Sequence, residues 1–301
     1  MTSNGARVAW ALLVVAGICG ALADRVPTRP PIVAGGYRVL SVDFHTHSAF
    51  WSDGALSPFG LVMEASRQGL DAIAITGHNQ VSDAKAGRWF SERIGGPTVI
   101  VGQELLGAGH HVIAVGTEQQ IDLPTVTAQV AEVHRQGGVA IVAHPMKEFW
   151  PSFTNAVKDQ LDGSEICHPL VYSNPKAQPT FEEFREGHNL AAIGSSDFHG
   201  LGRMGICRTY VFTNENTAAA IVDAVRARRT VVYGPNGATY GDPQLAALIV
   251  HRPELRAIAT TDAPASGLDW VSRTSGVMGL GLVLLTNPRR RRRARGVTDG
   301  L

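Results

Sequence analysis

The feature that most constrains the fold is an alternation of short apolar runs with amphipathic segments between about residues 38 and 233. The apolar runs have the length of strands, and the segments between them have apolar residues at helical spacing. Alternation of this kind predicts βα units and a mostly parallel sheet. We expect strands at residues 38–44, 71–76, 98–102, 111–115, 138–143, 164–166, 190–193 and 209–212, and helices at residues 57–68, 82–93, 125–136, 179–186 and 217–228.

Histidines and carboxylates follow several of these expected strands. His45 and His47 end the first one, and residues i and i+2 of a strand face the same side, so both imidazoles are expected to point to one spot. Asp197 and His199 repeat that spacing. Barrel enzymes build their active sites where parallel strands end. The other candidate ligands at strand ends or in the adjoining loops are Asp53, His78, Glu104 and His144.

His110 and His111 stand at the start of an expected strand, not at its end. For either to reach the same spot, that strand must run antiparallel, as the return of a hairpin from Glu104. The loop 105–109 contains two glycines and is short enough for a hairpin. We favour His111 over His110 as the ligand.

Imidazole and carboxylate groups without thiolates are typical of Zn²⁺, Mn²⁺ or Fe²⁺ sites. The sequence has no Cys-x-x-Cys pair, which excludes a thiolate zinc site, and no glycine-rich phosphate loop after a strand. The candidate ligands are too many for one tetrahedral ion, so we expect two or three divalent ions that share a bridging carboxylate. Such clusters activate water and bind both the attacking and the leaving oxygen of a displacement reaction at phosphorus, which predicts phosphoester hydrolysis.

The motifs around these residues resemble those of the PHP (polymerase and histidinol phosphatase) family over residues 40–235. The resemblance implies a distorted seven-stranded (βα) TIM-like barrel with a trinuclear metal site. It also implies the ligand sets: His45, His47, Glu104 and Asp197 for one ion, Asp53, His78 and His199 for a second, and Glu104 with His111 and His144 for the third.

One position departs from the family pattern. Members of the family commonly carry Asp before the histidine of the second motif, and Gly77 stands there in this chain. If that Asp supports the imidazole, its absence weakens the support of His78. Because His78 itself is present, we expect an altered site that still functions.

The function expected from these observations is metal-dependent hydrolysis of a small phosphorylated substrate by a metal-activated water. Lys147 and Arg208 are the candidate cationic groups for the phosphate, and His168 either lines the pocket or caps a turn. The alternatives are an exonuclease-like phosphodiesterase and a metal-binding or sensory module without catalysis. Six arginines at 289–293 and 295 leave the rest of the chain net acidic, which argues against nucleic acid as a partner.

The chain is expected to divide into four parts. Arg7, the apolar run 8–18 and the small residues before Asp24 predict a signal peptide or an N-terminal anchor at residues 1–23, with cleavage favoured. Residues 24–37 are expected to be a linker, residues 38–250 the PHP domain, and residues 251–301 a poorly structured tail. The apolar run 277–286 and the arginines after it are a candidate second anchor.

The expected location is therefore outside the cytoplasm, in the periplasm or on the cell surface, with or without a membrane anchor. Cys19 would leave with a cleaved signal peptide. Cys167 and Cys207 would then remain, either as a disulfide or as two buried thiols.

Overall fold

The chain divides into two compact units, which are described separately below. A computed structural model describes residues 3–23, 30–235, 237–252, 255 and 266–286. One unit comprises Arg29–Thr261, and the other comprises Met1–Thr28 together with Asp262–Leu301.

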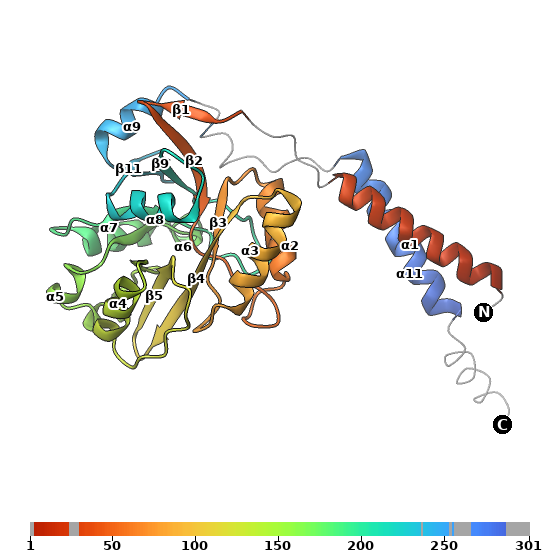
Figure 1. Cartoon of the computed structure of the whole chain (residues 1–301), viewed down its shortest axis with the longest axis horizontal. Helices are drawn as coiled ribbons and strands as arrows, with labels where there is room; N and C mark the ends of the chain where they lie inside the picture. Colours follow the sequence, from red (N-terminus) through yellow and green to blue (C-terminus); the bar gives the residue numbers. More distant parts are fainter. Residues whose placement is uncertain (1–2, 24–29, 236, 253–254, 256–265, 287–301) are drawn as a thin grey trace. The chain divides into compact units, whose positions relative to one another are not determined.

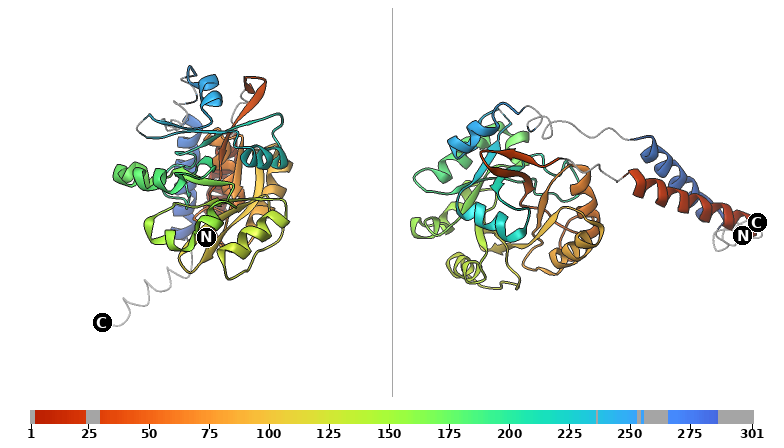
Figure 2. Two further views of the ribbon diagram at one scale, coloured as in Figure 1. Left: turned by 90° about the vertical axis from the view of Figure 1, so that its left-hand side faces the viewer. Right: turned by 45° about the horizontal axis from the view of Figure 1, so that its top comes forward.

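The larger unit is built on one sheet that curves into a nearly closed barrel (Figures 1 and 2). Its order is β11-β10-β9-β2-β3-β4-β5-β6-β7-β8, and β1 pairs with β2. The β2–β3, β3–β4, β6–β7 and β7–β8 pairs are parallel. The bounds are β1 (Ile32–Ala34), β2 (Tyr37–Asp43), β3 (Ala72–Ile75), β4 (Thr98–Gly107), β5 (His110–Val115), β6 (Val139–Val142), β7 (Gly163–Cys167), β8 (Ala191–Gly194), β9 (Thr209–Thr213), β10 (Thr230–Tyr233) and β11 (Thr239–Gly241).

The expected α/β barrel is confirmed, but the seven strands implied by the resemblance are too few. Strands β1, β10 and β11 were not expected, and β1 lies within the segment predicted to be a linker. The run Thr-Val-Val-Tyr of β10 is rich in the β-branched and aromatic residues that favour strands. The hairpin return is confirmed, because β5 pairs antiparallel with β4 and places His111 opposite Leu106.

The barrel closes where β8 meets β9. The hydroxyl of Thr209 accepts a hydrogen bond from the amide of Gly194 and donates one to its carbonyl, each at 2.8 Å. A Cβ atom on Gly194 would lie 2.9 Å from Val232 and 3.1 Å from the carbonyl oxygen of Arg208. Glycine is therefore required at this close approach. The seam holds together the two strands between which the loop with Asp197 and His199 runs.

Helices surround the barrel, and capping side chains fix where several begin. Ser57, Thr125 and Thr217 each accept a hydrogen bond from the amide three residues on, as N-caps do. The bounds are α2 (Pro58–Arg67), α3 (Ser82–Ile94), α4 (Val126–Arg135), η1 (Lys147–Ser152), α5 (Asn155–Lys158), α6 (Pro169–Ser173), η2 (Pro175–Ala177), α7 (Gln178–Arg185), α8 (Ala218–Arg226) and α9 (Pro243–Ile249).

The barrel interior is filled by apolar side chains from alternate strand positions. Leu40 and Val42 of β2 pack with Ala72 and Ala74 of β3 and with Ile113 of β5. Because apolar side chains fill the barrel, the candidate metal ligands lie beyond this apolar layer, toward one end of the barrel.

The described residues of the smaller unit form two helices, α1 (Ser3–Ala23) and α11 (Gly267–Thr286). The tail predicted to be poorly structured thus contains a helix of 20 residues that extends the expected anchor toward the N-terminus. The arginine run at 289–295 lies outside the described residues. Among the described helices, Asn4–Ala23 alone is long and apolar enough to cross a membrane by length and composition, a test that signal sequences also pass.

Candidate metal centre

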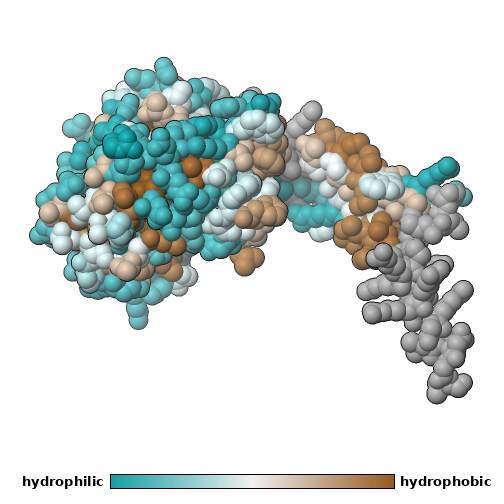
Figure 3. Space-filling view, turned by 60° about the horizontal axis from the view of Figure 1, so that its bottom comes forward, coloured by the Kyte–Doolittle hydropathy of each residue, from teal (hydrophilic) through white to brown (hydrophobic). Residues whose placement is uncertain are grey.

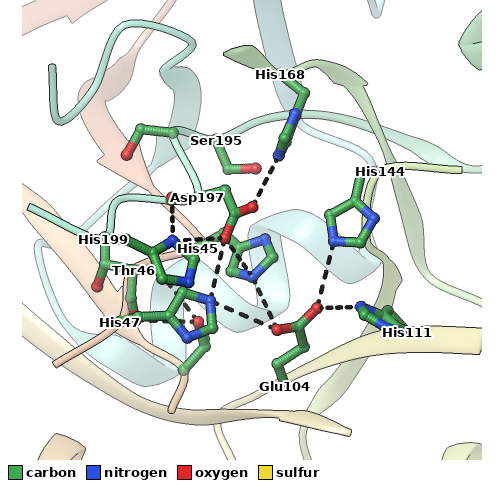
Figure 4. Close-up of polar contacts among 12 residues, drawn as sticks. His45, Thr46, His47, Glu104, His111, His144, His168, Ser195, Asp197 and His199 are labelled. Atoms are coloured by element: carbon green, nitrogen blue, oxygen red, sulfur yellow. Dashed lines mark hydrogen bonds and ion pairs between the residues drawn. The ribbon is translucent and has the colours of Figure 1, made fainter. Parts of the chain in front are cut away.

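Two buried imidazoles at the end of β2 form the centre of the site (Figure 4). The Nε2 atom of His45 lies 3.3 Å from Asp197 Oδ1, and that of His47 lies 3.1 Å from the same oxygen. Thr46 pairs with Phe198 as an isolated parallel bridge, which holds the loop carrying Asp197 beside β2. The i, i+2 spacing therefore brings both imidazoles to one carboxylate.

Glu104, on β4, lies at the middle of the cluster (Figure 4). Its carboxylate is almost fully buried, and five imidazoles surround it. The Oε1 atom lies 2.9 Å from His111 Nδ1 and 3.4 Å from His144 Nε2. On the other side of the carboxylate, Oε2 lies 3.0 Å from the Nε2 of His78, 3.4 Å from that of His45 and 3.5 Å from that of His47. This geometry is what a bridging carboxylate requires.

Asp53 gathers a second set of imidazoles from its exposed loop. Its Oδ1 lies 3.2 Å from His199 Nε2, 3.6 Å from His47 Nδ1 and 3.9 Å from His78 Nε2. The rings of His47 and His199 are stacked with centroids 4.1 Å apart. Among the described residues, three groups thus have ligand atoms within 4.8 Å of one another: His47, Asp53, His78 and His199; His45, His47 and Glu104; and Glu104, His111 and His144.

The buried nitrogens of this cluster fit metal ions. The Nε2 atoms of His45 and His47 are buried and have no hydrogen-bond partner. A buried polar atom without a partner costs free energy unless something occupies its lone pair. Their lone pairs converge with carboxylate oxygens and no thiolate takes part, so the donor set suits a divalent cation.

The carboxylates of the cluster are held in their ionised form. Burial would raise the pKa of Glu104, but His45, His111 and His144 outweigh it and hold the pKa well below the usual range. For Asp197, burial likewise opposes the effect of His45 and His168, which lowers the pKa far below its usual value. Both side chains are therefore acceptors ready for a cation.

Two candidate ligands have strained backbones. His144 has a φ of +25° and Asp197 a φ of +46°, both in the left-handed region that side chains other than glycine rarely adopt. Such conformations cluster at functional sites, where surrounding contacts enforce them. The amide of His144 donates to Glu165 Oε2, and the amide of Ser196 donates to Asp43 Oδ1 at 3.0 Å.

Glu165, on β7, is a site residue to which we assigned no role from the sequence. It is fully buried, and its Oε1 accepts a hydrogen bond from His45 Nδ1 at 3.0 Å. Ser195 donates to the same oxygen. Burial would raise its pKa, but His168 and His45 lower it to about 2. A carboxylate on the far nitrogen of a ligand histidine fixes the ring's tautomer and orientation. The signal in the sequence that could have identified Glu165 was its position near the end of an expected strand.

His168, for which the sequence left open whether it lines the pocket or caps a turn, caps a helix and also lies next to Asp197. Its Nδ1 accepts the amide proton of Leu170 at 3.2 Å, which caps helix α6. The proton of the ring therefore sits on Nε2, which faces Asp197 Oδ2 at 3.4 Å. His168 orients the second oxygen of Asp197, away from His45 and His47.

The two cationic candidates are placed elsewhere. Lys147 is exposed, pairs with Glu183 at 3.2 Å and lies over the ring of Trp150. Arg208 is buried, and its guanidinium donates to the carbonyl oxygens of Gly205 and Gln68. These contacts tie down the loop before β9, so Arg208 is a structural residue here. The contacts named here for Lys147 and Arg208 involve no histidine of the cluster.

The choice between the neighbouring histidines of β5 agrees with the geometry. His111 faces Glu104, whereas His110 points to the other side of the strand. There His110 is buried, and its Nε2 lies 2.9 Å from Gln129 Oε1. Cys167 and Cys207 are both buried free thiols in the structure.

Gly77 has no room for the side chain that the family commonly carries. A Cβ atom there would collide with Gln80 Nε2 and Asp83 Oδ2. Asp83 is buried and accepts a hydrogen bond from Ser48 Oγ at 2.7 Å. Burial raises the pKa of Asp83. A carboxylate from helix α3 thus fills the space beside position 77.

Gly77→Ala is expected to destabilise the larger unit by about 1–3 kcal/mol, because the methyl group forces Asp83 away from Ser48. That corresponds to a fall in melting temperature of roughly 2–12 °C in thermal unfolding. Gln80→Ala removes one of the two colliding side chains, so the double variant should recover part of the loss. Unchanged stability in Gly77→Ala would contradict this packing.

Comparison with known proteins agrees with the fold. A family model described as PHP-associated matches residues 177–230. A two-domain protein from Bacteroides vulgatus, which contains a predicted PHP-like metal-dependent phosphoesterase, has a similar structure. It has a TM-score of 0.56 and 26% sequence identity, and the match covers 70% of each chain. These two similarities support a relationship to the PHP domain family.

An uncharacterized protein of Methanocaldococcus jannaschii is also similar to this chain. The two are 24% identical over 139 residues, which cover 42% of this chain and 81% of the archaeal protein. The histidine and carboxylate groups of this chain fit divalent metal ions, in agreement with the predicted metal-dependent phosphoesterase that the Bacteroides protein contains.

Proposed function

We propose that the chain is a hydrolase that uses two or three divalent ions, of zinc, manganese or iron, to cleave a phosphoester of a small substrate. The observation that carries the proposal is the convergence of five imidazoles on the buried carboxylate of Glu104. The similarity to a protein containing a predicted metal-dependent phosphoesterase supports the same chemistry. When bound, the ions would supply an activated water and neutralise charge on the phosphoryl group.

The ligands would divide into three sets around the shared carboxylate of Glu104. The set at the centre is His45, His47, Glu104 and Asp197; the outer set is Asp53, His78 and His199; and the set on the β5 side is His111, His144 and Glu104. His47 lies between the first two sets, because its Nε2 faces Asp197 and its Nδ1 faces Asp53. The outer set is the more exposed, which suits a position that substrate must reach.

Residues behind the ligands orient them. Glu165 holds the proton of His45 on Nδ1, which leaves the Nε2 lone pair directed at Glu104 and Asp197. His168 holds the far oxygen of Asp197. Asp43 accepts the amides of Ser196 and Gly205 and so fixes both ends of the loop that carries Asp197 and His199.

The test is phosphate release from a panel of monoesters and diesters, including single-stranded DNA, by the metal-loaded chain. We expect release from at least one small phosphoester. His144→Ala should lower the rate at least about 10²-fold, because it removes a ligand near Glu104. His134→Ala is the matched control, since His134 pairs with Asp162 on the surface and should keep full activity.

Three outcomes would count against the proposal. Bound metal without turnover of any phosphoester would favour a metal-binding module. Release from DNA alone would favour the phosphodiesterase alternative. Full activity of His144→Ala would place the site elsewhere.

A further inference from the structure

We propose that α1 is retained in the mature protein and pairs with α11 as an antiparallel hairpin that spans a lipid bilayer. The hairpin would carry both chain termini on the cytoplasmic side and the metal-binding unit on the exported side. The proposal does not depend on the chemistry of the metal centre. Three observations support it: the close packing of the two helices, the exposed apolar side chains on their outer faces and the positions of their charged residues.

The two helices pack through small residues. Gly20 lies beside Ser272, and a Cβ atom on Gly20 would lie 3.0 Å from the Ser272 hydroxyl oxygen. A Cβ atom on Gly276 would lie 3.6 Å from the Cβ atom of Ala16. Further along, a Cβ on Gly279 would meet Leu13 at 2.9 Å. Residue numbers thus increase along α1 as those of its neighbours in α11 decrease, so the two helices are antiparallel. Small residues that let two helix backbones approach closely are typical of membrane helix pairs.

Polar groups at this interface are satisfied within the pair. The hydroxyl of Ser272 donates to the carbonyl oxygen of Ala16 at 2.8 Å, which joins the two helices directly. The hydroxyl of Ser275 donates to the carbonyl of Val271 at 2.6 Å within its own helix. Internal satisfaction of this kind is what a hydrocarbon environment requires.

The outer faces of both helices are apolar and uncovered. Trp10 is 68% exposed, Val277 72% and Leu285 73%. Hydrophobic colour covers much of the visible surface of the helix pair in Figure 3. A water-exposed protein rarely leaves so much contiguous apolar surface uncovered. At 1.5 Å per residue, the 21-residue helix α1 is about 30 Å long, which matches the hydrocarbon core of a bilayer. Helix α11 is not apolar enough to cross a membrane alone and would cross it only when paired with α1.

The charged residues of α11 lie in its first turns. Asp269 accepts hydrogen bonds from the amide and the hydroxyl of Ser266 at the helix start. Arg273 lies over the ring of Trp270, 6.0 Å from its centroid. An aromatic ring and a long cationic side chain near a helix end are typical of the membrane interface, where the cation reaches the headgroups. These residues place the start of α11 at one membrane surface.

The other end of the hairpin carries the positive charge. Arg7 lies near the start of α1, and the six arginines at 289–293 and 295 follow α11 in the sequence. Antiparallel packing brings the start of α1 and the end of α11 to the same end of the pair. Cationic residues next to a membrane span remain in the cytoplasm and attract anionic headgroups. Residues 24–266 leave from the opposite end, so the metal-binding unit would be exported.

Cleavage after Ala23 would remove α1 and uncover the glycine face of α11, which argues for retention. The first test is the intact mass of the full chain purified from membranes of an expressing bacterium. We expect residues 1–23 to be present and the chain to stay in the membrane pellet after alkaline carbonate extraction. A mass that lacks these residues, or release by carbonate, would overturn the proposal.

The second test measures the pairing. Ala16→Cys with Gly276→Cys, in a Cys19→Ser background, should cross-link under mild oxidant, because a Cβ distance of 3.6 Å suits a disulfide. Val15→Cys with Val277→Cys is the matched control at the same level, with both residues on the outer faces. The two cysteines of a disulfide do not react with maleimide–polyethylene glycol, so loss of the gel shift that this reagent causes reports the bond. Equal cross-linking in the two pairs, or cross-linking in the control pair alone, would refute the register.

The third test measures topology. Leu301→Cys in the same background should react with a membrane-impermeant maleimide only after the inner membrane is permeabilised. Labelling of this cysteine in cells whose inner membrane is intact would refute the cytoplasmic position of the arginine run.

Discussion

Replacing Glu104 by glutamine is expected to abolish hydrolysis and most metal binding. Glutamine keeps the size of the side chain but removes the negative charge that five imidazoles share. One of its two terminal atoms also becomes an NH₂ group, which cannot coordinate a cation. We expect phosphate release to fall by at least about 10³-fold, equivalent to roughly 4 kcal/mol in the barrier.

The measurement combines kinetics with metal content on the same preparation of Glu104→Gln. Glu118→Gln is the matched control, because Glu118 also forms an ion pair, with Arg88, but on the surface. The control should keep its metal and its activity. A Glu104→Gln variant with normal metal content and a rate within threefold of the parent would show that Glu104 is no bridge.

Asp43→Ala is expected to cause the largest loss of stability in the barrel. Asp43 is fully buried and accepts the amides of Ser196 at 3.0 Å, Gly205 at 2.8 Å and His45 at 3.3 Å. The hydroxyl of Ser196 donates to it as well. Alanine leaves these donors buried without an acceptor, at about 1–3 kcal/mol each. We expect a total loss of about 3–5 kcal/mol, or roughly 10 °C in melting temperature.

The same variant should lose activity for a separate reason. The loop that Asp43 holds carries Asp197 and His199, so metal affinity should fall even at temperatures where the barrel stays folded. Asp43→Asn keeps one acceptor oxygen and should fall between the parent and Asp43→Ala in both measurements. Thermal unfolding and metal titration of the two variants test this. Parental stability of Asp43→Ala would show that the loop is held by other contacts.

The sequence was sufficient to predict the barrel and to predict which residues lie together at its strand ends. Strand and helix periodicity are local properties, and His45, His47, Asp197 and His199 stand at strand ends that any parallel barrel brings together. The hairpin that turns His111 toward Glu104 also followed from local pattern, because a short glycine loop permits few alternatives. Their role as metal ligands stays a proposal.

Residues whose environment depends on distant packing could not be placed from the sequence. Arg208 was a candidate for binding phosphate, but its guanidinium is buried against backbone carbonyls, which no local pattern reveals. Glu165 looked like one more strand residue until the fold placed it behind His45. Only the apolar half of helix α11 was predicted, because Asp269 and Arg273 interrupt the apolar pattern before it. The first half of the helix instead packs against α1, where Ser272 donates to a backbone carbonyl of α1.

The most direct test of the metal centre is the number of divalent ions bound per chain. We expect two or three zinc, manganese or iron ions per chain by mass spectrometry of the native protein, with an elemental assay for their identity. Chelation should remove them and end phosphate release, and re-addition should restore both. One ion or none per chain in a folded, fully metal-supplied protein would contradict the multinuclear site.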